Sequence, residues 1–254
     1  MVRNMKIAID DGHGMETAGK RTPAFSGGSV MRENEFNRAV VAYLHDELIR
    51  NGFSVVLTAP EDTDTSLATR VQRANDAHAD YFVSVHANAF GNGWNDANGV
   101  ESFVYALNDA KTTGLARCIQ HELIQATGLR DRGVKENPTL YVLRKTTMPA
   151  VLCECGFMTN AAEAKLLKSD AYRKKCATSI CKGICAFAGK VYQEEKKEEK
   201  SPVVHGPVII ENRTEDVDLI LWEGRNYLSA RDVGEMFGYD VSFKGSTPIF
   251  TKKK

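Results

Sequence analysis

Strand-like and helix-like segments alternate along the first 190 residues, and this pattern constrains the fold more than any other feature of the sequence. Six short apolar runs are typical of strands, at residues 5–10, 53–58, 81–86, 100–105, 139–143 and 150–155. Amphipathic helical patterns fall among them, at residues 33–50, 67–77, 109–127 and 169–190. Such alternation is typical of a parallel sheet. We therefore expect an α/β fold over residues 1–190, with a largely parallel twisted sheet of about six strands and helices on both faces.

The remaining residues have a different character. A charged run at residues 194–200 precedes Ser201-Pro202, and we interpret residues 191–202 as a charged linker, with an extension of the preceding helix as the alternative. Residues 203–254 predict a small β-rich α+β domain. Its strands are expected near residues 208–210, 219–221 and 226–228, with a turn at Glu223-Gly224. A helix over residues 230–237, preceded by Ser229, and two closing strands complete it.

Composition narrows the possible partners. Lysine plus arginine total 33 and aspartate plus glutamate total 33, so the formal net charge is zero. A protein held mainly by phosphate backbones or anionic lipid needs a basic excess, so we expect neither nucleic acid nor membrane as a partner. The first six residues lead into a strand without the pattern of a signal peptide, and no run approaches the roughly 20 apolar residues of a membrane span. We expect synthesis in the cytoplasm, with the six cysteines as free thiols.

Three polar residues stand at the ends of predicted strands. His13 follows the first strand in Asp10-Asp-Gly-His-Gly14, His86 ends the third, and Glu154 ends the sixth within an otherwise apolar run. The carboxyl ends of parallel strands meet at one edge of a sheet, where ligands bind in such folds. A carboxylate in an apolar strand is costly without a partner or a task. One such residue alone is more often a satisfied core group, but three on one edge favour a site.

Two histidines and a carboxylate also have the composition of a catalytic zinc site that keeps one position for water. A further ligand would be an acid near the loop after the first strand, and Glu33 opens the first helix there. The alternative role for Glu33 is a favourable negative charge at a helix N-terminus.

These residues fall in motifs that resemble one enzyme family. In chain order the motifs are Ile7-Ala-Ile-Asp10-x-Gly12-His13-Gly14, Glu33-x-x-x-Asn37, Val83-Ser-Val-His86-Ala-Asn88 and Met148-Pro-Ala-Val-Leu-x-Glu154-x-Gly156-Phe157-x-x-Asn160. The segment from Met5 to Lys190 thus resembles the zinc-dependent N-acetylmuramoyl-L-alanine amidases of bacterial cell-wall turnover, of the amidase-3 type. Residues 19–23 are similar to the phage and prophage endolysin branch. The first loop departs from the family, because Met15-Glu16-Thr17 follows Gly14 where many members have a second glycine and an acid.

The resemblance implies Zn²⁺ as the cofactor, His13, Glu33 and His86 as its ligands, and Glu154 as the catalytic acid and base. It implies peptidoglycan as the partner and hydrolysis of the amide between N-acetylmuramic acid and L-alanine. Asp10 is expected to orient His13. The residues expected to line the substrate groove are Asn88, Trp94 and Arg144, with a plain surface role as the alternative for Arg144.

The expected setting is that of a phage or prophage endolysin, which acts on the cell wall after release. The alternatives are a mother-cell lysis amidase of a spore former, a zinc peptidase, and a wall-binding protein without catalysis. The complete set of His13, Glu33, His86 and Glu154 argues against the last of these.

The C-terminal domain resembles the small module named after the N-terminal region of copper amine oxidase. The resemblance lies in residues 217–221, 224–233 and 237–243, and nothing in their sequence resembles a copper site. A cell-wall-targeting role is expected from the pairing of such modules with wall hydrolases rather than from these residues.

Overall fold

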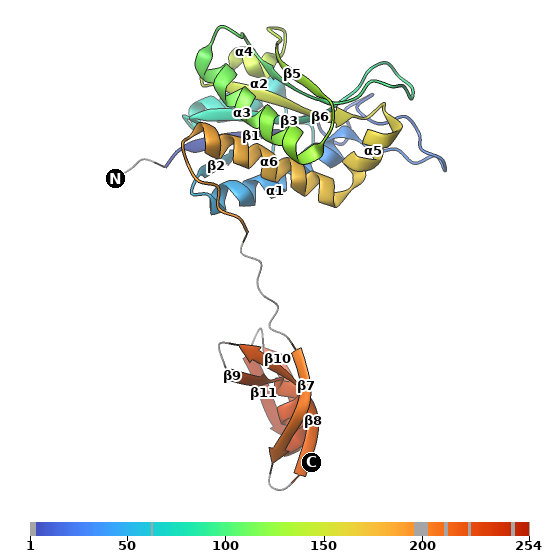
Figure 1. The fold of residues 1–254 in the computed structure, drawn as a ribbon, viewed down its shortest axis with the longest axis vertical. Coiled ribbons are helices and arrows are strands. Elements are labelled where there is room, and N and C mark those ends of the chain that lie inside the picture. The colour runs from blue at the N-terminus through green and yellow to red at the C-terminus, as the bar shows by residue number, and fades with distance from the viewer. Residues whose placement is uncertain are drawn as a thin grey trace. The chain divides into compact units, whose positions relative to one another are not determined.

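The chain divides into two compact units in a computed structural model, residues 1–195 and residues 196–254 (Figure 1). The structure describes residues 4–61, 63–195, 203–210, 213–222, 225–244 and 247–253. The turn expected at Glu223-Gly224 and residues 196–202 of the expected linker lie outside the described residues. Residues 190–195, which precede that part of the linker, have neither helical nor strand conformation.

The first unit is built on one six-stranded sheet with the order β2-β1-β3-β6-β4-β5. Its strands are β1 (Lys6–Asp11), β2 (Ser54–Leu57), β3 (Tyr81–Asn88), β4 (Val100–Val104), β5 (Asp131–Glu136) and β6 (Ala150–Phe157). The strands β2, β1, β3 and β6 are parallel, whereas β4 is antiparallel to β6 and parallel to β5. The expected largely parallel sheet of about six strands is confirmed, with one reversal of direction between β6 and β4.

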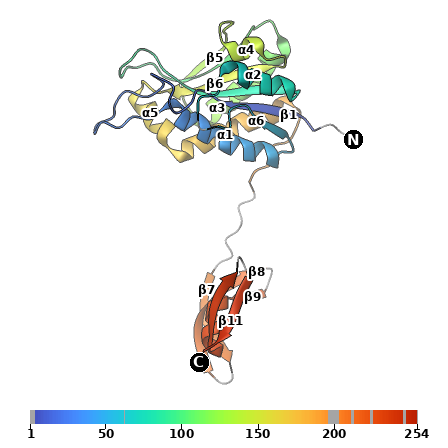
Figure 2. The same ribbon diagram turned by 180° about the vertical axis from the view of Figure 1, so that it is seen from behind.

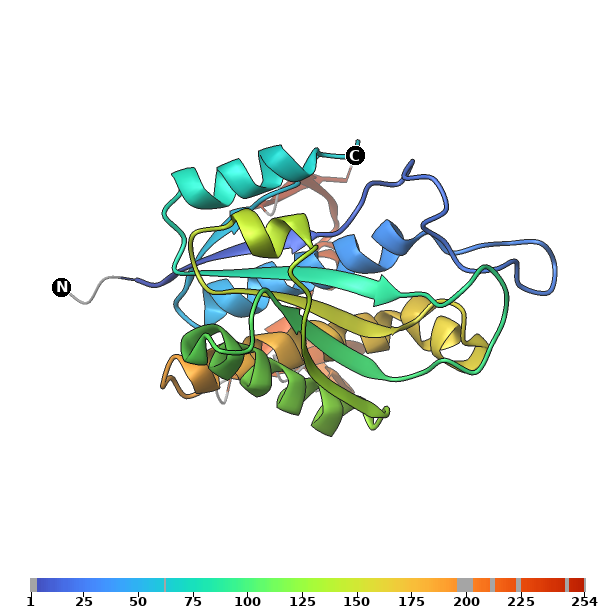
Figure 3. The same cartoon turned by 90° about the horizontal axis from the view of Figure 1, so that it is seen from above.

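Helices cover both faces of this sheet (Figures 2 and 3). One face carries α1 (Glu33–Arg50), α3 (Ala110–Thr127) and α6 (Asp170–Phe187), and the other carries α2 (Leu67–Asp76) and the short α4 (Tyr141–Lys145). A further helix, α5 (Ala161–Lys168), follows β6. The four long helices begin and end within three residues of their predicted limits. Local signals set these limits: Asp109 caps α3 by accepting from Lys111 N and Thr112 N, and Gly128 ends it in the left-handed conformation.

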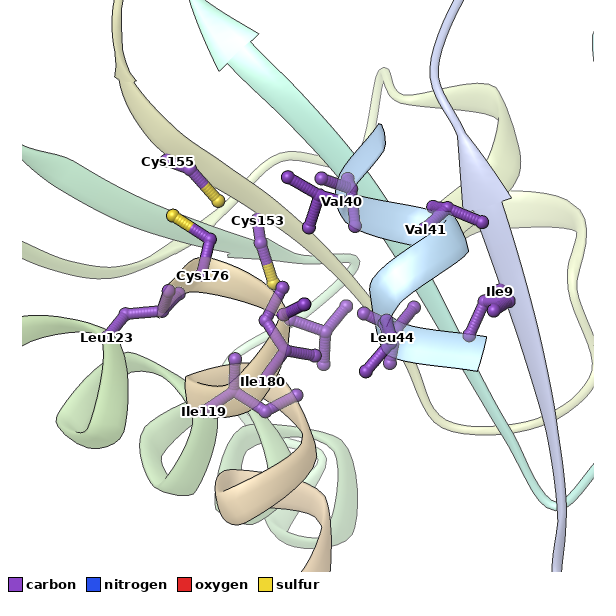
Figure 4. Close-up of a cluster of buried hydrophobic side chains, with 14 of the residues drawn as sticks. Ile9, Val40, Val41, Leu44, Ile119, Leu123, Cys153, Cys155, Cys176 and Ile180 are labelled. Atoms are coloured by element: carbon purple, nitrogen blue, oxygen red, sulfur yellow. The ribbon is translucent and has the colours of Figure 1, made fainter. Parts of the chain in front are cut away.

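The larger hydrophobic core lies between the sheet and α1, α3 and α6. In Figure 4, Leu44 of α1, Ile119 of α3 and Ile180 of α6 converge beneath the thiols of Cys153 and Cys176. All six cysteines are free thiols and five of them are buried, because they serve as small apolar side chains in or beside this core.

A smaller core lies on the opposite face, beneath α2 and α4. Ala8, Phe82 and Leu152 contribute to it from β1, β3 and β6. Side chains alternate across a strand, so the residue two positions further along each strand points to the same face. Those residues are Asp10, Ser84 and Glu154. Apolar packing near the start of each strand therefore gives way to polar groups towards the carboxyl edge.

Three elements differ from the sequence-based expectation. Residues 139–143 were expected to form a strand, but this prediction is wrong because α4 begins at Tyr141. The helix buries Val142 and Leu143 in the smaller core, so tertiary packing overrides the strand propensity of an apolar run. The sixth strand of the sheet is instead β5, which is polar and pairs with a single neighbour. The helix α5 was also missed, and Asn160 caps it by accepting from Ala162 N and Glu163 N.

The second unit holds an antiparallel arrangement of β7 (Val203–Ile210), β8 (Arg213–Trp222) and β9 (Arg225–Leu228). The helix α7 (Ala230–Phe237) follows, capped by Ser229 and ended by Gly238 as the sequence predicts. The hairpin of β10 (Tyr239–Lys244) and β11 (Thr247–Lys252) completes the described part. Among the described residues of both units, every helix is too short or too polar to cross a bilayer.

Candidate metal centre

The structure brings His13, Glu33 and His86 together at the carboxyl edge of β1 and β3. His86 Nδ1 lies 2.9 Å from Glu33 Oε1, and His13 Nε2 lies 3.4 Å from Glu33 Oε2. The two imidazole rings are 5.0 Å apart and nearly perpendicular. One ligand atom from each of the three residues lies within 4.8 Å of the other two. The set can therefore serve a single metal ion.

His13 owes its position to an unusual backbone conformation. Its φ is +64°, a left-handed value that non-glycine residues rarely adopt. The carbonyl oxygen of His13 accepts hydrogen bonds from Asn34 Nδ2 at 3.0 Å and from Arg70 Nη2 at 2.8 Å. Beside it, a Cβ atom on Gly12 would lie 2.0 Å from His86 Cε1. The motif thus needs glycine at position 12 so that the two imidazoles can approach each other.

Burial and charge set the protonation of the three ligands. Burial lowers the pKa of His13 to about 4, against the opposing charge of Glu33, so His13 is neutral at pH 7. Burial alone would raise the pKa of Glu33, but the hydrogen bond from His86 and the charges of His86, His13 and Lys20 hold it below its usual value. For His86, burial is outweighed by the hydrogen bond and charge of Glu33, and its pKa is raised. Neutral imidazole and ionised carboxylate are the forms that bind zinc, so His13 and Glu33 are already in those forms, whereas protonated His86 would release its proton when a metal ion binds.

A hydrogen-bond chain behind His86 begins at Asp10. Ser84 Oγ donates to Asp10 Oδ2 at 2.6 Å and lies 3.1 Å from His86 Nε2. Because the serine proton goes to Asp10, Ser84 Oγ accepts a hydrogen bond from His86 Nε2. The other ring nitrogen, Nδ1, then faces Glu33 and is the atom available to a metal ion. Asp10 was expected to orient His13, and that role stays a prediction: Arg70 donates to both Asp10 Oδ1 and His13 O, while Ser84 links Asp10 to His86.

Arg70 holds the loop that carries His13. Its side chain is only 1% exposed, and it was not among the site residues predicted from the sequence. Its Nε donates to Thr65 O, Nη1 donates to Asp10 Oδ1 and Asp11 O, and Nη2 donates to His13 O and Asp64 Oδ1. All five N–H groups of a guanidinium are thereby paired. Burial, the largest influence, would raise the pKa of Asp10, but Arg70 and the hydroxyls of Ser84 and Thr58 hold it below its ordinary value.

Glu154 lies beside His86 on the neighbouring strand. The two residues are register partners in the parallel β3–β6 pair, whose strands are about 4.8 Å apart. Glu154 falls within β6 rather than at its end as expected. Its Oε2 atom is buried without a hydrogen-bond partner among the described residues. Burial raises the pKa of this carboxyl to about 8, against the lowering effect of His86.

These groups open into a cavity of about 590 Å³. His13, His86 and Glu154 line it, and Leu67, Leu140 and Tyr141 contribute apolar surface to the same lining. Lys20 also lines the cavity, with its Nζ atom 3.9 Å from Glu33 Oε2. The arrangement has the small set of convergent polar groups in an apolar cavity that is typical of an enzyme site.

The three residues expected to bind substrate lie outside the lining of this cavity in the described part of the chain. Arg144 is exposed on α4, with its guanidinium 5.8 Å from the Tyr141 ring centre. Trp94 is 40% exposed, packs on Phe25 with ring centres 5.3 Å apart, and donates from Nε1 to Ala24 O. Asn88 Nδ2 donates to Glu101 Oε1 at 2.7 Å. Their roles in substrate binding stay predictions.

Sequence reasoning overlooked Arg70, Ser84 and Glu101. Glu101 carried a usable signal, because it is an acid inside the apolar run of residues 100–104, as Glu154 is in its own strand. Arg70 carried none, because its five acceptors come from segments that are separate in the sequence.

Comparison with known proteins places this site in a family. The family profile described as N-acetylmuramoyl-L-alanine amidase (Amidase_3) matches residues 7–186. The chain is 37% identical over 182 residues to the N-acetylmuramoyl-L-alanine amidase LytC of Bacillus subtilis (strain 168), covering 71% of this chain and 35% of LytC. It is 36% identical over 184 residues to the endolysin of Bacillus phage SPP1, covering 70% of this chain and 64% of the endolysin.

A solved structure gives the same result for the fold. The N-acetylmuramoyl-L-alanine amidase from Clostridium difficile 630 superimposes with a TM-score of 0.67 and 32% sequence identity, over 73% of this chain and 97% of the solved chain. The matched share corresponds in extent to the first unit, which carries His13, Glu33, His86 and Glu154.

Proposed function

The chain belongs to the Amidase_3 family of N-acetylmuramoyl-L-alanine amidases, and on this premise we propose that it cleaves peptidoglycan with one bound Zn²⁺. The bond hydrolysed is the amide between N-acetylmuramic acid and L-alanine. One observation carries the proposal: His13, Glu33 and His86 meet beside the buried carboxyl of Glu154, and His13, His86 and Glu154 line a single cavity.

His13, Glu33 and His86 would hold the metal. Two imidazoles and a carboxylate are the donors that zinc prefers in catalytic sites, and the close contact between Glu33 and His86 suits a shared cation. When bound, zinc polarises a carbonyl oxygen and makes water a better nucleophile near neutral pH. Ser84 and Asp10 fix the orientation of His86, and Arg70 with Asn34 fixes the backbone of His13.

Glu154 transfers the proton in this mechanism. Its Oε2 atom, without a partner among the described side chains, accepts a proton from the attacking water and passes it to the nitrogen of the leaving L-alanine. Burial favours the neutral form of this carboxyl and so raises its pKa, which helps Glu154 to hold the proton that it takes from water until the leaving nitrogen receives it.

Product analysis of digested cell walls tests the reaction. We expect release of peptides with N-terminal L-alanine and no increase in reducing sugar ends. Glu154→Gln should keep zinc and wall binding but lose activity by at least about a hundredfold, the usual contribution of a general acid or base. Glu122→Gln, on α3 across the sheet, is the matched control and should retain activity. New ends at a peptide crosslink would favour the zinc peptidase alternative and contradict the amidase assignment.

Metal analysis tests the cofactor separately. We expect about one zinc per chain in the purified protein, since three protein ligands and one open position form a single site. His86→Ala should lose most of that zinc. A His86→Ala protein with full zinc content would refute the ligand assignment.

For the biological setting, we propose a phage or prophage endolysin, on the basis of the loop at residues 19–23. This loop lies at the site, because Lys20 lines the cavity and Lys20 O accepts from Glu33 N at 2.9 Å. A mother-cell lysis amidase is the alternative. Transcription timing separates them: expression late in phage induction supports the first, and expression confined to sporulation supports the second.

For the C-terminal unit, we propose cell-wall targeting. Its support is the pairing of a small β-rich unit with an amidase of this family. The full chain should sediment with purified walls more completely than residues 1–195 at equal concentration, with both proteins carrying zinc. Equal sedimentation would remove the targeting role and leave the catalytic assignment intact.

A further inference from the structure

The active-site face of the sheet continues beyond Glu154 onto β4. Glu101 of β4 and Glu154 of β6 are register partners in the antiparallel pair, and Phe103 and Leu152, two residues further along, are the next partners on the same face. Directly opposed residues of an antiparallel pair have Cβ atoms about 5 Å apart on the same face. Glu101 therefore lies next to Glu154, on the side away from His86.

Two cations of β5 converge on Glu101. Arg132 Nε donates to Glu101 Oε2 at 2.7 Å, and Lys135 Nζ donates to the same oxygen. The other oxygen, Oε1, accepts from Asn88 Nδ2 at 2.7 Å. Glu101 is only 4% exposed, so its charge is compensated inside the protein by these three donors.

A bulge in β6 adds a support for Arg132. The register between β3 and β6 shifts so that His86 pairs with Glu154 and Asn88 pairs with Phe157. Gly156, whose φ is +139°, lies in this shift and turns Phe157 to the face that carries His86 and Asn88. The Arg132 guanidinium rests 4.9 Å from the centre of the Phe157 ring. Glu163 holds the bulge by accepting from Phe157 N and Gly99 N at 2.7 Å each.

The cluster of Glu101, Arg132 and Lys135 carries more positive than negative charge, and its two cations are partly exposed to solvent. Arg132 and Lys135 supply two positive charges and Glu101 one negative charge, which leaves a net charge of +1 beside the catalytic carboxyl. The side chains of Arg132 and Lys135 are 26% and 40% exposed, whereas that of Glu101 is 5% exposed. The anion of the cluster is thus buried and its cations are open to a ligand.

We propose that Arg132 and Lys135 bind the free α-carboxylate of the second residue of the substrate's peptide stem, close to the amide that is cleaved. This inference rests on the proposed amidase function. The stem is the only source of such a group near the scissile bond, because the lactyl carboxyl of N-acetylmuramic acid is itself consumed in that amide. Arg132 and Lys135 lie on β5, two strands from Glu154 in the sheet order, and a guanidinium beside an ammonium matches a carboxylate through charge-assisted hydrogen bonds. The chain therefore distinguishes a stem with a free carboxylate from a stem with a carboxamide at that position.

Steady-state kinetics of the zinc-loaded full chain with two defined substrates test the proposed preference for a carboxylate over a carboxamide. They are N-acetylmuramoyl-L-alanyl-D-glutamate γ-methylamide and its counterpart N-acetylmuramoyl-L-alanyl-D-isoglutamine γ-methylamide, which differ only in whether the α-carboxyl is a carboxylate or a carboxamide. Loss of one charge-assisted hydrogen bond predicts a KM about tenfold or more higher for the carboxamide, with kcat within about twofold. Equal KM values with normal turnover of both would overturn the proposal and leave the amidase function standing. Cleavage of neither, together with no cleavage of whole walls, would instead contradict the proposed function.

Variants then assign the preference to the cluster. Lys135→Met should raise KM for the carboxylate substrate about tenfold and leave KM for the carboxamide within about twofold, and Lys135→Arg should restore the preference. The matched control Arg117→Gln removes one positive charge from α3 on the opposite face and should change neither value. Equal changes for both substrates in Lys135→Met would show that Lys135 only supports Glu101, and would refute the binding role. If Lys135→Met does not fold, the comparison of the two substrates with the unmodified chain still decides the proposal.

Discussion

Replacing Arg70 by glutamine should both destabilise the protein and weaken its hold on zinc. The Arg70 side chain is 1% exposed and donates to five acceptors, one of them the carboxylate of Asp10. Without it, Asp10 becomes a buried charge that has lost its cation, a change that costs about 3–5 kcal/mol in the free energy of unfolding. A typical domain has about 5–15 kcal/mol, so the variant should still fold at 25 °C.

The effect on zinc follows from the backbone of His13. Its left-handed conformation costs about 1–3 kcal/mol and persists only while the surroundings hold it. Arg70 and Asn34 are the two side chains that bind its carbonyl, so the loss of Arg70 releases half of this restraint. Loss of an outer partner of a metal ligand commonly lowers affinity about 10–100-fold, and we expect a decrease in that range.

Two assays check the reasoning on the full chain. Urea unfolding followed by circular dichroism at 222 nm reports chiefly on α1–α6, and competition with a chromophoric chelator gives the zinc affinity. Arg73→Gln is the matched control: Arg73 lies on the same helix but pairs with Glu61 at the surface, where ion pairs contribute little. This account of the site would be refuted if Arg70→Gln lowered the free energy of unfolding by less than about 1 kcal/mol, or if it left the zinc affinity unchanged.

Three further predictions concern the same face of the sheet. Ser84→Ala breaks the chain from Asp10 to His86 and should lower zinc affinity about 10–100-fold by chelator competition, whereas Ser102→Ala, a buried serine on the opposite face of the sheet, should not. Gly12→Ala places a Cβ 2.0 Å from His86 Cε1 and should abolish zinc retention after dialysis, whereas Gly93→Ala, with open space around it, should keep full zinc. Because the folded pKa of Asp10 is lowered, its ionised form stabilises the fold above the unfolded value of about 3.9, and this contribution is lost as pH falls through the folded pKa. Urea midpoints measured from pH 6 to pH 3 should therefore fall less steeply in Asp10→Asn than in the unmodified chain, and parallel curves would contradict the prediction.

The parts of the fold that were predictable are those whose signal is local. The helix at residues 33–50 is bounded by its own periodicity and by Gly52, and the first, third and sixth strands are apolar because helices cover both of their faces. The strand β5 escaped notice because it lies at the edge of the sheet, where polar residues and a glycine are tolerated. The strand predicted at residues 139–143 is wrong because a short apolar run looks the same in a buried strand and in a buried helix.

The candidate site likewise contains residues that the sequence could single out and contacts that it could not. His13 between two glycines and Glu154 inside an apolar run are unusual in their own sequence neighbourhoods, so the sequence could single them out. The additional link from Asp10 to His86 depends on strand register, since Ser84 and Asp10 are partners across β1 and β3. Register pairs residues 74 positions apart here, and no local pattern records such a pairing.

The reversal of direction between β6 and β4 has a consequence for how enzymes of this architecture can diversify. His13, Glu33 and His86, the proposed metal ligands, precede residue 89, whereas Glu101, Arg132 and Lys135 come from one continuous segment that runs from β4 through α3 to β5. Because β4 is antiparallel to β6 and parallel to β5, both β4 and β5 begin at the carboxyl edge of β6, and α3 returns the chain from one to the other. Exchange of residues 100–136 between two relatives would therefore transplant the surface proposed to meet the peptide while leaving His13, Glu33, His86 and Glu154 in place. Asn88 and Phe157, which contact Glu101 and Arg132, would stay with the recipient, so the exchange should succeed between relatives that share these two residues.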